Sequence, residues 1–140
     1  MRNRESTLVS DDTAFKENAA LVMRTCRRLV DFEFGYDERS IAWLEKYIER
    51  LQIDGAFKED FEKFAGMFGC YLGEAIIACY GGQWCEDDDD PAHVLLDNDI
   101  RAFPFAKVQK QMKNGLASGD SILGFFRTIP ALLSMQREKR

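Results

Sequence analysis

One apolar stretch constrains the fold more than any other feature: between Phe64 and Tyr80 the only charged residue is Glu74. Apolar side chains in and just before this stretch recur at three- and four-residue steps, which predicts a helix from about Lys58 to Tyr80. The stretch is short for a membrane span, and a charge near the bilayer centre costs at least about 2.5 kcal/mol. We therefore expect this helix to be the buried spine of a water-soluble fold.

Three glycines mark one side of this predicted helix, because Gly66, Gly69 and Gly73 stand on successive turns. Each glycine costs up to about 1 kcal/mol of helix propensity, so a gain in packing should compensate. We predict that another helix or a strand approaches closely on this side. A homodimer is an alternative, with the contact made by the glycine side or by an edge that carries Trp43 and Tyr47.

The rest of the chain favours an α+β fold with a helical N-terminal half, a small three-stranded antiparallel sheet and two C-terminal helices. Besides the helix at 58–80, the predicted helices cover about 12–35, 37–54, 105–114 and 120–135. Their N-caps are expected at Asp12 or Thr13, at Asp37 and at Asp120, and a frayed tail is expected from Gln136. The predicted strands are 83–85, 93–96 and 100–103, and the last two are joined by a turn at 97–99.

Length and composition fit one domain over residues 1–140, with an ordered core of about 12–133. The net charge of -5 argues against a general nucleic-acid binder, because neutralising phosphates requires a clustered basic surface. The N-terminus lacks the apolar segment of a secretory signal, and the cysteines form no CxxC pair. We expect a cytoplasmic protein with no membrane partner.

Glu74 needs an explanation, because an ionised carboxylate on a buried helix is costly unless it is paired or hydrogen-bonded. One interpretation is a structural pair with Arg101, Lys107 or Arg39, or a position at the rim that reaches water. The other is a pocket in which the carboxylate has a raised pKa and serves as an acid, a base or a ligand anchor. The residues of this candidate pocket are Glu74, Trp84, Arg101 and His93.

An acidic run follows the predicted spine helix, and its members are Glu86, Asp87, Asp88, Asp89 and Asp90. The run lacks the alternating acids, central glycine and terminal glutamate of an EF-hand, so calcium binding is not favoured. A solvated loop is the commonest meaning of such a run. The alternative is a docking site for a basic protein partner, in which the loop steers association more than it supplies affinity.

Side chains suited to catalysis are scarce. His93 is the only histidine, and its spacing from Cys79 and Cys85 matches no zinc motif. Neither cysteine has a nearby basic residue that would lower its pKa, and no phosphate-binding glycine motif or serine-hydrolase elbow occurs. We predict no catalytic residue, metal or cofactor. We interpret Trp84 as a core anchor that pins the sheet onto the spine helix.

A longer pattern resembles a group of small bacterial domains of unknown function. Its most specific part is Leu72-Gly73-Glu74 followed by Gly82-Gln83-Trp84, and a hairpin before Pro104 completes it. The similarity covers about 34–129. The resemblance implies a fold and a bacterial origin, and it carries over no active site. Domains of this kind often look like immunity or interaction proteins.

Two hypotheses for the function follow. The first is a non-enzymatic protein-binding module, immunity- or adaptor-like, whose acidic loop and adjacent hairpin bind a basic protein. The second is a small-ligand-binding protein or an enzyme with a pocket around Glu74 and Trp84. The scarcity of catalytic side chains favours the first.

Overall fold

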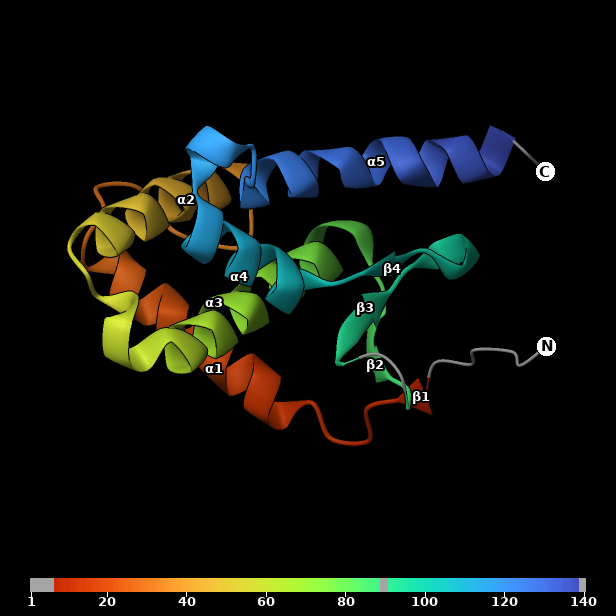
Figure 1. Ribbon diagram of the computed structural model, residues 1–140. Helices are drawn as coiled ribbons and strands as arrows, with labels where there is room; N and C mark the ends of the chain where they lie inside the picture. Colours follow the sequence, from red (N-terminus) through yellow and green to blue (C-terminus); the bar gives the residue numbers. More distant parts are fainter. Residues whose placement is uncertain (1–6, 89–90, 139–140) are drawn as a thin grey trace.

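Helices make up most of the chain in the computed structural model, which describes residues 7–88 and 91–138 (Figure 1). The architecture is α+β, as expected from the sequence. The elements are β1 (Thr7–Leu8), α1 (Thr13–Arg27), α2 (Glu38–Ile53), α3 (Phe57–Tyr80), β2 (Gln83–Glu86), β3 (His93–Leu95), the short helix η1 (Asp97–Asp99), β4 (Arg101–Ala102), α4 (Pro104–Asn114), the short helix η2 (Leu116–Ser118) and α5 (Ile122–Glu138).

The central helix is α3, which packs mainly against α1 and α4 (Figure 1). Its residues are buried without interruption from Phe68 to Ile76. The sequence prediction of a buried spine helix is therefore confirmed. Among the described helices, none combines the length and the apolarity that crossing a bilayer requires.

Two of the three spine glycines allow a close approach. A Cβ atom on Gly73 would overlap the ring of Trp84 in β2, and one on Gly69 would overlap the ring of Phe105 in α4. The predicted approach of a helix or strand is thus confirmed for both, whereas a Cβ on Gly66 would meet no atom within 4 Å. Because the chain itself covers Gly69 and Gly73, they do not serve as a homodimer face.

The sheet lies beside the C-terminal end of α3 and has the antiparallel order β1-β2-β3-β4 (Figure 1). Trp84 pairs with Val94, which pairs in turn with Ala102, and all three are buried in the core with α3. The ring of Trp84 lies 4.5 Å from that of Phe15, between centroids. The interpretation of Trp84 as a core anchor is confirmed.

The sheet differs from the sequence prediction in having four strands. The prediction missed β1 because Thr7–Leu8 is a two-residue, exposed strand without an apolar pattern. The predicted turn at 97–99 is present, and Asn98 and Asp99 both have positive φ, at 63° and 61°. Asparagine and aspartate adopt this left-handed conformation more readily than most residues.

The N-caps were predicted with mixed success. Asp37 caps α2, because its Oδ1 accepts a 2.8 Å hydrogen bond from the Ser40 amide. Asp12 precedes α1 but makes no such bond, and its carboxylate lies 3.6 Å from the ammonium of Lys16. At α5 the prediction of Asp120 is wrong: the hydroxyl of Ser121 accepts the bond from the Gly124 amide instead.

The last helix is also longer than predicted. It continues through Pro130 to Glu138, and so includes the first residues of the tail that was expected to fray from Gln136. Glu45 of α2 supports its beginning, because Oε1 accepts bonds from the Leu123 amide and the Ser121 hydroxyl. A glutamate from another helix therefore satisfies the Leu123 amide, one of the amide groups that the start of a helix leaves without partners.

Candidate binding site

Glu74 projects from α3 into the space between α1 and β2, and its side chain is almost fully buried. Its Oε2 accepts a 2.7 Å hydrogen bond from Nε1 of Trp84, and its Oε1 accepts a 3.2 Å bond from Nζ of Lys16. The sequence-based choices for the cation are therefore wrong. Lys16 was missed because it precedes Glu74 by 58 residues, and no local spacing connects the two.

The electrostatics of this pair favour a structural role. Burial lowers the pKa of Lys16, but the hydrogen bond and the charge of Glu74, with a smaller effect of Asp12, outweigh it, so the pKa of Lys16 is raised. Burial, followed by the charge of Glu74, raises the pKa of Tyr36. Because both carboxylate oxygens of Glu74 already have donors from the chain, the arrangement is that of a buried, satisfied carboxylate.

His93 and Arg101 lie on the other face of the sheet from Trp84. Neighbouring residues of a strand point to opposite faces, and His93 pairs with Cys85, the residue after Trp84. Nδ1 of His93 lies 2.9 Å from the carbonyl oxygen of Pro91. The structure thus brings Glu74 and Trp84 together but separates them from His93 and Arg101, so the predicted four-residue pocket does not exist.

A hollow of about 250 Å³ does lie beside Trp84, between β1 and the start of α1. Lys16 and Gln83 contribute polar atoms to it, whereas Glu74, His93 and Arg101 do not line it. Over the described residues, no three His, Cys, Asp or Glu side chains are grouped so as to hold a metal ion.

The acidic run has an internal role for one of its members. Asp87 has only 7% of its side chain exposed, and its Oδ2 lies 3.2 Å from Nη1 of Arg101 in β4. Glu86 and Asp88 are exposed, while Asp89 and Asp90 lie outside the described residues. The hairpin turn at 97–99 is at the opposite end of the β2–β3 pair, because Cys85 pairs with His93 and Gln83 with Leu95. Docking by the loop and the adjacent hairpin stays a prediction.

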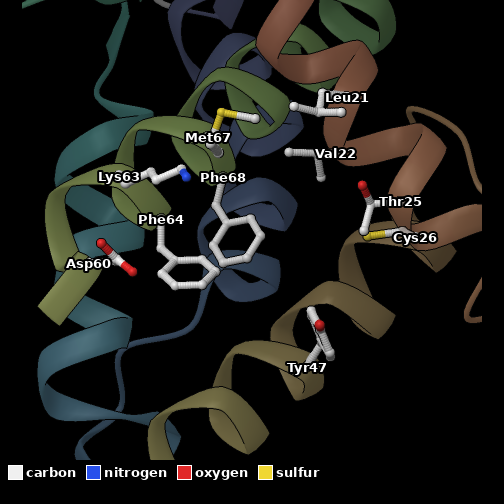
Figure 2. A pocket seen from close by; sticks show the side chains of 10 residues that line it. All are labelled: Leu21, Val22, Thr25, Cys26, Tyr47, Asp60, Lys63, Phe64, Met67 and Phe68. Atoms are coloured by element: carbon white, nitrogen blue, oxygen red, sulfur yellow. The ribbon is translucent and has the colours of Figure 1, made fainter. Parts of the chain in front are cut away.

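A second hollow, lined mostly by apolar side chains, was not predicted from the sequence. It is a cavity of about 270 Å³ between α1, α2 and α3, and Figure 2 shows the side chains around it. Its lining consists of Leu21, Val22, Thr25 and Cys26 from α1, Tyr47 from α2, and Asp60, Lys63, Phe64, Met67 and Phe68 from α3. We call it the helical cavity.

The helical cavity exists because the three helices do not close on one another. α2 packs chiefly against α5 and α4, whereas α3 packs chiefly against α1 and α4. Tyr47 is stacked on Trp43 with ring centroids 5.0 Å apart, so its ring forms a wall of the cavity and does not fill it. Val22, Cys26 and Phe68 belong to the core, and the space beside them stays open.

The polar groups of the helical cavity lie around its apolar walls. In Figure 2, Asp60 and Lys63 stand on the α3 side, while Thr25 and Tyr47 bring hydroxyl groups from α1 and α2. Burial raises the pKa of the Cys26 thiol to about 11. Cys26 is therefore a neutral wall residue at physiological pH and not a thiolate nucleophile.

Sequence periodicity identifies Val22, Cys26, Phe64 and Phe68 as apolar positions of their helices. It does not say which of these side chains meet a neighbour and which border an open space, because that depends on the angles between the helices. The signal that was available is the short segment 57–64, in which three phenylalanines stand among charged residues that include Asp60 and Lys63.

Comparison of the chain with protein-family models, with curated proteins and with solved structures finds no match. The resemblance to small bacterial domains therefore stays a prediction.

Proposed function

We propose that this protein is a binding protein that takes up a small, largely apolar molecule in the helical cavity. One observation carries the proposal: the core side chains Val22, Cys26 and Phe68 border a space of about 270 Å³ that no side chain of the described residues fills. This space opens to solvent beside exposed residues such as Thr25 and Lys63. Apolar surface that stays open to solvent in this way often marks a ligand-binding groove. An unfilled apolar space at this position is what a ligand of matching size would complete.

The size and lining of the cavity indicate the kind of ligand. Engineered apolar cavities of about 150 Å³ take up benzene, so about 270 Å³ suits one ring with a short substituent or a branched aliphatic chain. Ligand sites of proteins are typically apolar with a few polar groups that orient the ligand. Thr25 and Tyr47 are such groups.

The experiment is a titration with indole as a neutral probe, followed by calorimetry. For a ligand of this size we expect saturable binding with a Kd of about 0.1–1 mM. A Thr25→Trp variant places a large ring over the cavity from an exposed helix position and should weaken binding at least tenfold. Arg24→Trp is the matched control, because Arg24 is exposed on the same helix and does not line the cavity.

The outcomes are distinct. Saturable binding that Thr25→Trp weakens and Arg24→Trp leaves intact supports the proposal. Absence of saturable indole binding to the unmodified protein, or equal binding by both variants, overturns it.

The acidic loop supports a second candidate function, the docking of a basic protein partner. The favouring observation is the partly buried Asp87–Arg101 ion pair, which fixes the base of the loop while Glu86 and Asp88 on either side of Asp87 are exposed. Such exposed charges act mainly on the association rate. With a partner identified, the double change Glu86→Gln and Asp88→Asn should lower that rate and its salt dependence. The change Glu62→Gln on α3 should not, and equal rates for both variants contradict docking at the loop.

A further inference from the structure

The charged residues of the helical cavity have a feature that its apolar walls do not explain. Asp60 and Lys63 lie three positions apart on α3, and both line the cavity. Within the described part of the chain, neither takes part in an ion pair or a hydrogen bond of its side chain. Oppositely charged residues at this spacing on a helix are close enough to pair with each other.

The backbone of α3 departs from a regular helix at Asp60, so the spacing of Asp60 and Lys63 is not that of an ideal helix. Asp60 has φ -118° and ψ 31°, which is not helical, although α3 continues on both sides of it. Helix kinks usually occur at proline or glycine, and the nearest glycine, Gly55, precedes α3. The distortion thus coincides with the residue that brings a negative charge to the cavity.

Figure 2 shows how the charged groups are placed. The ammonium of Lys63 extends toward the rings of the cavity, and the carboxylate of Asp60 stands at the edge beside Phe64. A purely anionic ligand would have one favourable and one unfavourable neighbour here, and so would a purely cationic one. A ligand that carries both charges matches both groups.

We propose, on the basis of the function proposed above, that the ligand is a small zwitterion with an apolar body, such as an aromatic or branched aliphatic amino acid. Its apolar part lies among Val22, Met67 and Phe68, its carboxylate faces Lys63 and its ammonium faces Asp60. Ion pairs at such an open position are weak, so each charge tunes affinity and selectivity while burial of the apolar body supplies most of the binding.

The test compares three probes with the same ring by calorimetry: L-phenylalanine, 3-phenylpropionate and 2-phenylethylamine. We expect L-phenylalanine to bind about two- to fivefold more tightly than either singly charged probe. Lys63→Gln should weaken L-phenylalanine and 3-phenylpropionate by a similar factor without weakening 2-phenylethylamine. Asp60→Asn should weaken L-phenylalanine and 2-phenylethylamine without weakening 3-phenylpropionate.

Lys58→Gln and Glu59→Gln are matched controls, because both residues are exposed near the start of α3 and do not line the cavity. Neither should change the order of the probes. All four substitutions are at exposed positions, and a thermal melt confirms that each variant is folded.

The result separates this inference from the proposed function. If indole binds and L-phenylalanine binds no better than the singly charged probes, the inference of a zwitterionic ligand is wrong, whereas the proposed apolar binding site is supported. If neither indole nor any of the three probes binds, both fail. Probe-specific losses in Lys63→Gln and Asp60→Asn, absent from the two controls, support the inference.

Discussion

The indole nitrogen of Trp84 donates a 2.7 Å hydrogen bond to the carboxylate of Glu74, and both side chains are buried. The pair joins the sheet to the central helix α3 through a polar contact inside an apolar interface. A buried carboxylate is tolerated only with such donors, and Lys16 supplies the second one. The lone charge of the apolar stretch therefore orients β2 on α3.

We predict that Trp84→Phe lowers the free energy of unfolding by about 2–4 kcal/mol, because it removes a hydrogen bond to a buried charge and leaves a void. Glu74→Gln should cost less, about 1 kcal/mol, because the amide oxygen still accepts the bond from Trp84 and the half-exposed ion pair with Lys16 is worth little. Urea unfolding measures both. Trp43→Phe, at a half-buried position, is the control; a loss as large as that of Trp84→Phe would contradict the role of the hydrogen bond.

The glycines of α3 give a second prediction with an internal control. Gly73→Ala should destabilise the protein by about 1–3 kcal/mol, because the new methyl group overlaps the ring of Trp84 in a packed core. Gly66→Ala should be neutral or stabilising by up to about 1 kcal/mol, because alanine favours the helix and the position is open. Thermal unfolding measures the stability of both variants. Similar losses of stability in the two would contradict the close contact between Gly73 and the ring of Trp84.

A third prediction concerns the two glutamates by which α2 contacts α5. Glu45→Ala should cost about 1–3 kcal/mol, because the partly buried Leu123 amide and Ser121 hydroxyl lose their acceptor. Glu38→Ala should cost less than about 1 kcal/mol, because the ion pair of Glu38 with Arg127 is exposed. Hydrogen exchange should also speed up at the amides of Leu123 and its neighbours in Glu45→Ala alone. Unchanged exchange there would contradict the capping role.

The raised pKa of Cys26 predicts a pH dependence of stability. The unfolded thiol loses its proton near pH 8.5, whereas burial raises the folded pKa to about 11. Between these values the unfolded state binds fewer protons, so stability falls as pH rises, by up to about 3 kcal/mol. Cys26→Ala should show a shallower decline over this window in chemical unfolding at a series of pH values. The other buried thiols and tyrosines contribute equally in the unmodified protein and in Cys26→Ala. Equal slopes of stability against pH in the two proteins would therefore contradict a raised pKa of Cys26.

Much of the fold was predictable because local patterns determine it. The apolar stripe and glycines of α3 predict a buried helix with close neighbours, and Asp37 predicts where α2 begins. The partner of Glu74 was not predictable, since Lys16 is brought to it only by the packing of α1 on α3. That His93 and Trp84 point to opposite faces follows from the strand register, which places His93 opposite Cys85 and which strand alternation alone does not determine. The helical cavity depends on where α2 lies relative to α1 and α3, which no local pattern contains.

The most direct test of the binding site uses the methionine methyl groups as NMR probes during a titration with indole. Met67 lines the helical cavity, Met112 is buried in the core, and Met135 is exposed on α5. We predict a saturable shift of the Met67 methyl signal, with Met112 and Met135 nearly unchanged. An unchanged Met67 signal, or a larger shift at Met135, would contradict a ligand site between α1, α2 and α3.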